Sequence, residues 1–63
     1  MRIVEKLLLK PEEAAELLSV GRDRVFALIA SGELRSLKLG RSRRIAVADL
    51  EAFVAARLAA VAA

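Results

Sequence analysis

The chain has 63 residues and a formal net charge of +3, and it contains no cysteine and no histidine. This length has room for one small domain, so we expect a single domain over residues 1–63 of a protein of the reducing cytosol, without a membrane span or a signal peptide. The missing residue types exclude disulfides, cysteine or histidine zinc sites and the usual nucleophile–base pairs of hydrolases, so we expect no catalytic residue, no metal and no cofactor.

The first third of the chain predicts a short strand followed by a helix. Three leucines at positions 7–9 precede Lys10 and Pro11, and the residue before a proline favours extended backbone. Proline suits the first turn of a helix, and the apolar residues at positions 14, 17 and 18 then form one apolar face. We therefore expect a strand over residues 7–9 and a helix over residues 11–18.

A second helix is predicted after a short turn that contains Gly21. Val25, Leu28 and Ile29 lie at positions i, i+3 and i+4, and Gly32 is the residue type that commonly ends a helix. We expect this helix over residues 22–31. Two helices joined by a three-residue turn with a glycine form a helix-turn-helix pattern.

After the second helix, the apolar residues repeat every two positions instead. Leu37 and Leu39 alternate with polar residues, Ile45 and Val47 alternate with Arg44 and Ala46, and a glycine-bearing loop at residues 40–43 separates the two segments. This spacing is typical of a β-hairpin.

A last helix is expected from about Ala48 or Asp49 to near the C-terminus. We expect four residues of its apolar stripe to close the core: Leu50, Phe53, Val54 and Leu58. Val61 and the terminal alanines would then be the only spare apolar surface, far below the ~800 Å² per partner of a standard interface. We therefore expect the free protein to be a monomer. The elements together predict an α+β fold that is mainly α.

The surplus positive charge is confined to the middle of the chain. Residues 22–44 hold seven bases and two acids, whereas residues 1–21 and 45–63 each have a net charge of −1. Basic residues concentrated in this way favour a surface that binds a polyanion, although a solvated loop can have the same composition. The seven bases are Arg22, Arg24, Arg35, Lys38, Arg41, Arg43 and Arg44.

The positions of these bases on the predicted elements indicate DNA. The first turn of the second helix meets base edges in a helix-turn-helix complex, and Arg22 and Arg24 lie there. We expect Arg24 to read a base, with an exposed pair in which Arg24 bridges Asp23 or Glu16 as the alternative. A basic hairpin beside such a helix acts as a wing that follows the backbone or enters a minor groove. Its contacts are expected from Arg41, Arg43 and Arg44, with Arg35 and Lys38 as weaker contacts to the backbone.

Phe26 has two interpretations. It follows Val25, a core residue, so it either closes the core against the hairpin or stays partly exposed and packs under the DNA backbone.

Three runs resemble the winged helix-turn-helix domain of the excisionase family, which is related to the DNA-binding domain of MerR-type regulators. They are LLKPEEAAELLSV at residues 8–20, VFALIASGEL at residues 25–34 and LGRSRRI at residues 39–45, within a match over residues 7–58. The resemblance implies that the second helix lies in the major groove and the wing in the neighbouring minor groove. On that mapping Asp23 and Ala27 join the arginines of the helix, and Ser42 joins those of the wing.

Three positions depart from the family pattern. Gly21 stands where a capping serine or threonine is common, which weakens the start of the helix by a few tenths of a kcal/mol at most. Arg35 stands where proline is frequent. Arg43 stands where many members have an aromatic residue, so a phosphate contact replaces stacking as the expected role.

The resemblance implies a stand-alone excisionase, a recombination directionality factor of a phage or integrative element. Copies would bind side by side on double-stranded attachment-site DNA in the nucleoid, bend it, and direct an integrase partner toward excision. A small transcription regulator of the same fold is the first alternative. A protein-interaction adaptor that uses the alanine-rich C-terminal helix without binding DNA is an alternative from a different class.

Overall fold

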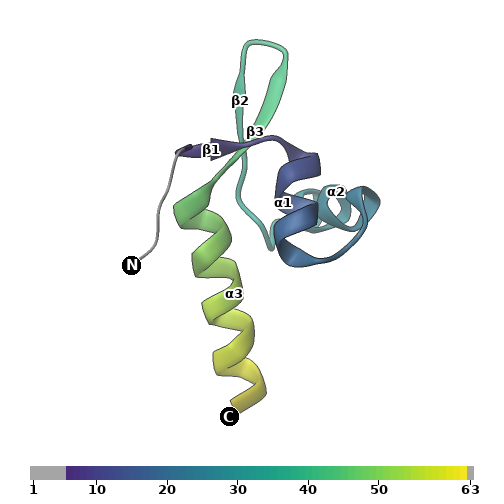
Figure 1. The fold of residues 1–63 in the computed structure, drawn as a ribbon. Helices are drawn as coiled ribbons and strands as arrows, with labels where there is room; N and C mark the ends of the chain where they lie inside the picture. Colours follow the sequence, from purple (N-terminus) through teal and green to yellow (C-terminus); the bar gives the residue numbers. More distant parts are fainter. Residues whose placement is uncertain (1–5, 63) are drawn as a thin grey trace.

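The computed structural model describes residues 6–62, so the single domain expected over residues 1–63 extends beyond the described residues at both ends. Three helices and a small antiparallel sheet make up the fold, which confirms the predicted α+β, mainly α, winged helix-turn-helix (Figure 1). No helix of the described part is long and apolar enough to cross a membrane. The elements are β1 (Leu8–Leu9), α1 (Pro11–Leu18), α2 (Arg22–Ser31), β2 (Leu37–Leu39), β3 (Ser42–Ala46) and α3 (Val47–Ala62).

The helix-turn-helix has the bounds that the sequence predicts. At the start of α1, the backbone N–H of Lys10 donates to Oε1 of Glu13 at 2.8 Å, and the Lys6 ammonium pairs with the same carboxylate. These two contacts lower the pKa of Glu13. Helix α2 ends at Gly32, whose φ of +84° is a left-handed conformation that glycine adopts without strain.

The sheet has the strand order β1-β3-β2, so β3 is the central strand. The hairpin turn consists of Gly40 and Arg41 alone, because Gly40 has a φ of +61° and permits a turn of two residues. The sequence predicts a longer loop and places Val47 in the second strand, and both predictions are wrong. Strand β3 begins at Ser42, and Val47 is the first residue of α3.

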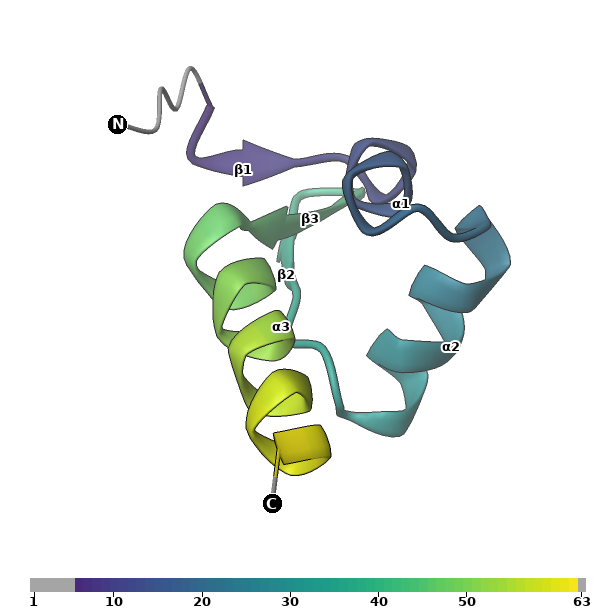
Figure 2. The same ribbon diagram turned by 60° about the horizontal axis from the view of Figure 1, so that its bottom comes forward.

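The core lies where α1, α2 and β3 meet the first turns of α3. Leu50 is buried and Phe53 is partly buried against it, but Val54 and Leu58 are 38% and 65% exposed. Their predicted core role is wrong because α3 extends beyond the body of the domain (Figures 1 and 2). We call residues 54–62 the free half of α3. The buried residues of the core cluster are Leu9, Ala14, Ala15, Val25, Leu34, Ile45 and Leu50.

Candidate nucleic-acid interface

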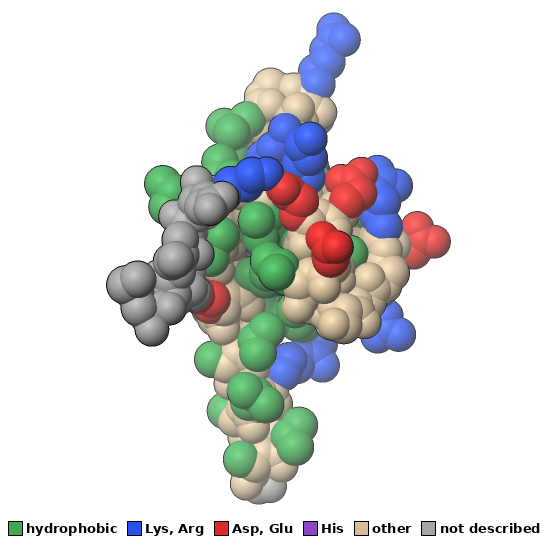
Figure 3. Space-filling view, in the orientation of Figure 1, with side chains coloured by type: hydrophobic (Ala, Val, Ile, Leu, Met, Phe, Trp, Pro, Cys, Tyr) green, Lys and Arg blue, Asp and Glu red, His purple; other side chains and the backbone are tan. Residues whose placement is uncertain are grey.

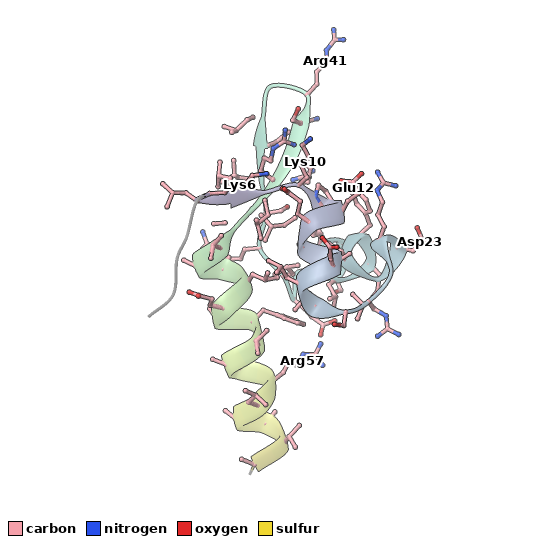
Figure 4. All side chains as sticks on the ribbon, viewed as in Figure 1. Lys6, Lys10, Glu12, Asp23, Arg41 and Arg57 are labelled. Carbon is pink, nitrogen blue, oxygen red and sulfur yellow. The ribbon has the colours of Figure 1, made fainter. Side chains whose placement is uncertain are left out.

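Three separate elements surround a hollow rich in cations, which we call the basic hollow. It has a volume of about 420 Å³ and lies between the start of α1, the first turns of α2 and the wing, residues 37–46. Lys and Arg side chains gather over this end of the molecule in Figure 3, and Figure 4 shows Arg41 extending from the tip of the wing. Five cations and one acid line the hollow, together with Pro11 and Phe26: Lys10, Glu12, Arg22, Arg41, Arg43 and Arg44.

Arg22 is held in place at the edge of α2 by two neighbours. Its Nε donates to Oε2 of Glu12 at 3.0 Å, and its Cζ lies 4.7 Å from the centre of the Phe26 ring. A cation over an aromatic face is attracted by the ring, and an arginine that is already oriented loses less freedom when it binds. These contacts therefore fix the direction of the Arg22 side chain beside the wing.

Glu12 is the only acid of the basic hollow among the described residues. Its own backbone N–H and the charge of Arg22 lower the pKa of the Glu12 carboxyl below its usual value of 4.5. The carboxylate is therefore charged at neutral pH, where it both orients Arg22 and offsets part of the positive potential.

The wing places like charges opposite one another. Lys38 of β2 is the direct partner of Arg43 in β3, so both side chains lie on the same face of the hairpin. Arg43 Nη1 donates to Oγ of Ser36 at 3.1 Å, and Arg44 Nη1 donates to the backbone oxygen of Arg43 at 2.9 Å. No acid occurs in residues 36–48 to offset these cations. Like charges directly opposite are destabilising, so a polyanion would relieve this repulsion.

The structure brings some of the predicted site residues together and leaves others apart. Arg22 of α2 shares the basic hollow with Arg41, Arg43 and Arg44 of the wing. Arg24 lines a different hollow beside α3, and among the described residues it pairs with neither Asp23 nor Glu16. The DNA role of Arg24 thus stays a prediction, and the ion pair of this helix is the one between Arg22 and Glu12.

The remaining predicted residues do not line the basic hollow. Asp23 and Ala27 are exposed one turn apart on α2, on the side opposite buried Val25. Arg35 lies near Asp49, with 3.9 Å between Nη1 and Oδ1, and Lys38 is exposed on β2. Ser42 is half-buried and pairs with Leu39.

Three functional residues of the basic hollow were missed or left open by the sequence: Lys10, Glu12 and Phe26. Phe26 is half-buried, lines the hollow and is outside the core cluster, so the interpretation that it closes the core is wrong. Its position four residues after Arg22, on the same side of α2, was a usable signal. Lys10 reaches the hollow because the start of α1 lies beside the wing, which local sequence does not reveal.

Comparison with known proteins gives one matching family model and a similar curated protein. A family model described as a helix-turn-helix domain matches residues 8–58. A probable excisionase from Saccharopolyspora erythraea is 46% identical over 59 residues, which are 94% of this chain and 59% of that protein. The chain thus spans about three-fifths of the length of this curated relative. No solved structure matches it.

Proposed function

Because this chain belongs to the helix-turn-helix domain family, we propose that it is a sequence-specific DNA-binding protein that acts as an excisionase. The resemblance to excisionase-family helix-turn-helix proteins is confirmed, and DNA binding is the activity of that domain. The proposal also includes a change in the shape of the DNA. Copies bind side by side on attachment-site DNA, bend it and direct an integrase toward excision.

The basic hollow is the observation that supports this proposal most. Its five cations come from the start of α1, from α2 and from the wing, so one concave surface presents charge to a phosphate backbone from three directions. In the proposed complex, α2 enters the major groove with Asp23 and Ala27 toward the bases, and the wing enters the adjacent minor groove.

Individual roles follow from the contacts of each side chain. Arg22 is oriented by Glu12 and Phe26, so we assign it to a base edge, where a fixed guanidinium can make two hydrogen bonds to guanine. Arg41, Arg43 and Arg44 lie on a two-stranded hairpin and are assigned to phosphates. Gly21 provides no side-chain cap, so the first N–H groups of α2 are free to meet a phosphate oxygen.

The proposal is tested with attachment-site DNA in an electrophoretic shift assay and a circular-permutation bending assay. We expect site-specific, cooperative binding and a bend. Arg43→Ala should weaken binding to all sequences alike and flatten the salt dependence by about one unit of slope.

The matched control is Ala59→Glu, which also lowers the net charge by one unit but lies in the free half of α3. It should leave the affinity close to that of the wild type. Site-specific binding without a bend would contradict the excisionase role and favour the small transcription regulator. Absence of DNA binding would contradict both.

A further inference from the structure

A second hollow, which we call the apolar groove, separates α2 from the free half of α3. Its volume is about 440 Å³, and it shares no residue with the basic hollow. One wall consists of Leu18, Val20 and Leu28, and the other of Phe53, Ala60 and Val61. The groove is therefore bounded on both sides by apolar side chains.

No described segment of the chain covers this groove. Val20 at its rim is 38% exposed and Val61 is 84% exposed. Figure 3 shows apolar side chains along the free half of α3. These side chains leave the groove open to solvent.

The charges around the groove identify the kind of partner. Two arginines line it, and no lining residue of the described part is acidic. Arg57 pairs with Glu33 and lies 5.1 Å from the centre of the Phe53 ring, whereas Arg24 has no ion pair among the described residues. A complementary ligand therefore combines apolar side chains with carboxylates.

We propose that the apolar groove binds an acidic amphipathic helix of another protein. The residues of α3 that line it, at positions 53, 57, 60 and 61, follow helical spacing over about 12 Å. A partner helix with apolar side chains at i, i+3 or i+4 and i+7 matches this length, and its flanking carboxylates face Arg24 and Arg57. This site is separate from the proposed role on DNA.

A second copy of the chain does not offer such a helix in its described residues. In α1, Glu12 pairs with Arg22 and Glu13 with Lys6, so Glu16 is the one acid left beside exposed Leu17. Residues 52–62 of α3 contain no acid at all. Asp23 is the one acid of α2, and Asp49 and Glu51 lie in the first two turns of α3, ahead of its exposed apolar residues. No described helix of a second copy thus places several carboxylates along an exposed apolar stripe, and we expect the partner to be a different protein.

The α3 wall of the groove lies away from the basic hollow. In Figure 4, Arg57 lies below the helix-turn-helix, on the side away from Lys10 and Arg41. A copy on DNA would thus still present the α3 wall of its apolar groove to a protein partner.

The first test uses a labelled 14-residue peptide with leucines at positions 3, 6, 7 and 10 and glutamates beside them. Two controls are a scrambled peptide without the stripe and a peptide with lysines in place of the glutamates. In fluorescence anisotropy with the full chain, we expect the acidic striped peptide to bind about tenfold more tightly than either control. Equal binding of all three peptides would overturn the proposal.

The second test compares two variants of neighbouring exposed alanines. Ala60→Glu places a carboxylate in the groove, whereas Ala59→Glu places the same charge outside it. Ala60→Glu should weaken binding of the acidic peptide at least about tenfold, with Ala59→Glu close to the wild type and DNA affinity the same in both. Equal peptide binding by the two variants would overturn the assignment of the apolar groove as the peptide site.

Sedimentation equilibrium without peptide tests whether a second copy of the chain occupies the groove instead. The proposal expects a monomer at micromolar concentration for the wild type and for Ala60→Glu. A wild-type dimer that Ala60→Glu converts to a monomer would assign the groove to a second copy and overturn the partner helix.

Discussion

Residues 36–48, which hold the wing, carry four cations and no acid, whereas residues 52–62 at the end of α3 carry Arg57 as their only charge. The wing places Lys38 opposite Arg43, and the free half of α3 leaves Leu58 and Val61 uncovered. Each end thus has an unfavourable feature in the free protein, like-charge repulsion at one and exposed apolar surface at the other. Since salt screens only the first, the two ends should respond differently to the same conditions.

Salt concentration should affect DNA binding at the basic hollow far more than peptide binding at the apolar groove. If four to six phosphates are contacted, the slope of log K against log[salt] should be about −4 to −5, so DNA affinity falls about 250- to 1,000-fold between 50 and 200 mM salt. Titrations by fluorescence anisotropy measure this slope. Binding of the acidic peptide to the apolar groove should change only a few-fold over the same range. A DNA slope near zero would contradict the assignment of the basic hollow.

The two parts of α3 should differ in their contribution to stability. Leu50 is 6% exposed, so Leu50→Ala should lower the free energy of unfolding by about 2–5 kcal/mol and leave so small a domain largely unfolded. Leu58→Ala removes the same atoms from a side chain that is 65% exposed and should cost less than about 0.5 kcal/mol. Thermal unfolding followed by circular dichroism compares them. Similar losses for both variants would show that the free half packs on the body.

Two arginines of α2 should act at different ends of the molecule. Arg22→Ala should weaken specific DNA binding by ~1–3 kcal/mol and relax the preference at one base position, because Arg22 lies in the basic hollow. Arg24→Ala should change DNA affinity by less than about 0.5 kcal/mol but weaken peptide binding. Titrations of both variants with DNA that carries the specific site or a mutated site measure these changes in affinity and base preference. A larger loss for Arg24→Ala would support the base contact that the sequence predicts for it.

Glu12→Gln should change DNA affinity less than Arg22→Ala does, and in the opposite direction. Loss of this carboxylate leaves the basic hollow more positive and Arg22 less fixed, so non-specific affinity should rise about two- to five-fold while discrimination between sites falls. Because the pKa of Glu12 is lowered, its ion pair is formed above the ordinary value of 4.5 and is lost as the pH falls through the lowered pKa. The wild type should therefore bind DNA like Glu12→Gln only at a pH below the lowered pKa of Glu12. Unchanged discrimination at neutral pH would contradict the positioning role of Glu12.

Local patterns were sufficient to predict the helix-turn-helix. The bounds of α1 and α2 follow from Pro11, Gly32 and the spacing of apolar residues, all of which act within one or two turns of the chain. The apolar stripe of α3 was also visible in the sequence. A stripe shows which face of a helix is apolar, but it does not show how many turns of that helix pack against the rest of the domain. Val54 and Leu58 continue the stripe of Leu50 and are nevertheless exposed.

The candidate site was predictable only where its residues are neighbours in sequence. The arginines of the wing lie within four residues, so their cluster is visible in the sequence. Arg22 and Arg24 both begin α2, but residues two apart lie about 200° apart around a helix. Which of the two faces the wing depends on how α2 packs against α1, and that is a tertiary property. The position of Lys10 in the basic hollow is a tertiary property too, whereas the position of Phe26 four residues after Arg22 was visible in the sequence.

The junction between β3 and α3 has a mechanical consequence. Ala46 ends the strand and Val47 begins the helix with no loop between them, and the Val47 N–H donates to the backbone oxygen of Leu7 at 2.9 Å. We therefore expect the wing and α3 to move together as one lever about the point where β1 pairs with β3. The sixteen residues of α3 are about 24 Å long, so a tilt of the wing by about 10° on deformed DNA would swing the far end of α3 by about 4 Å.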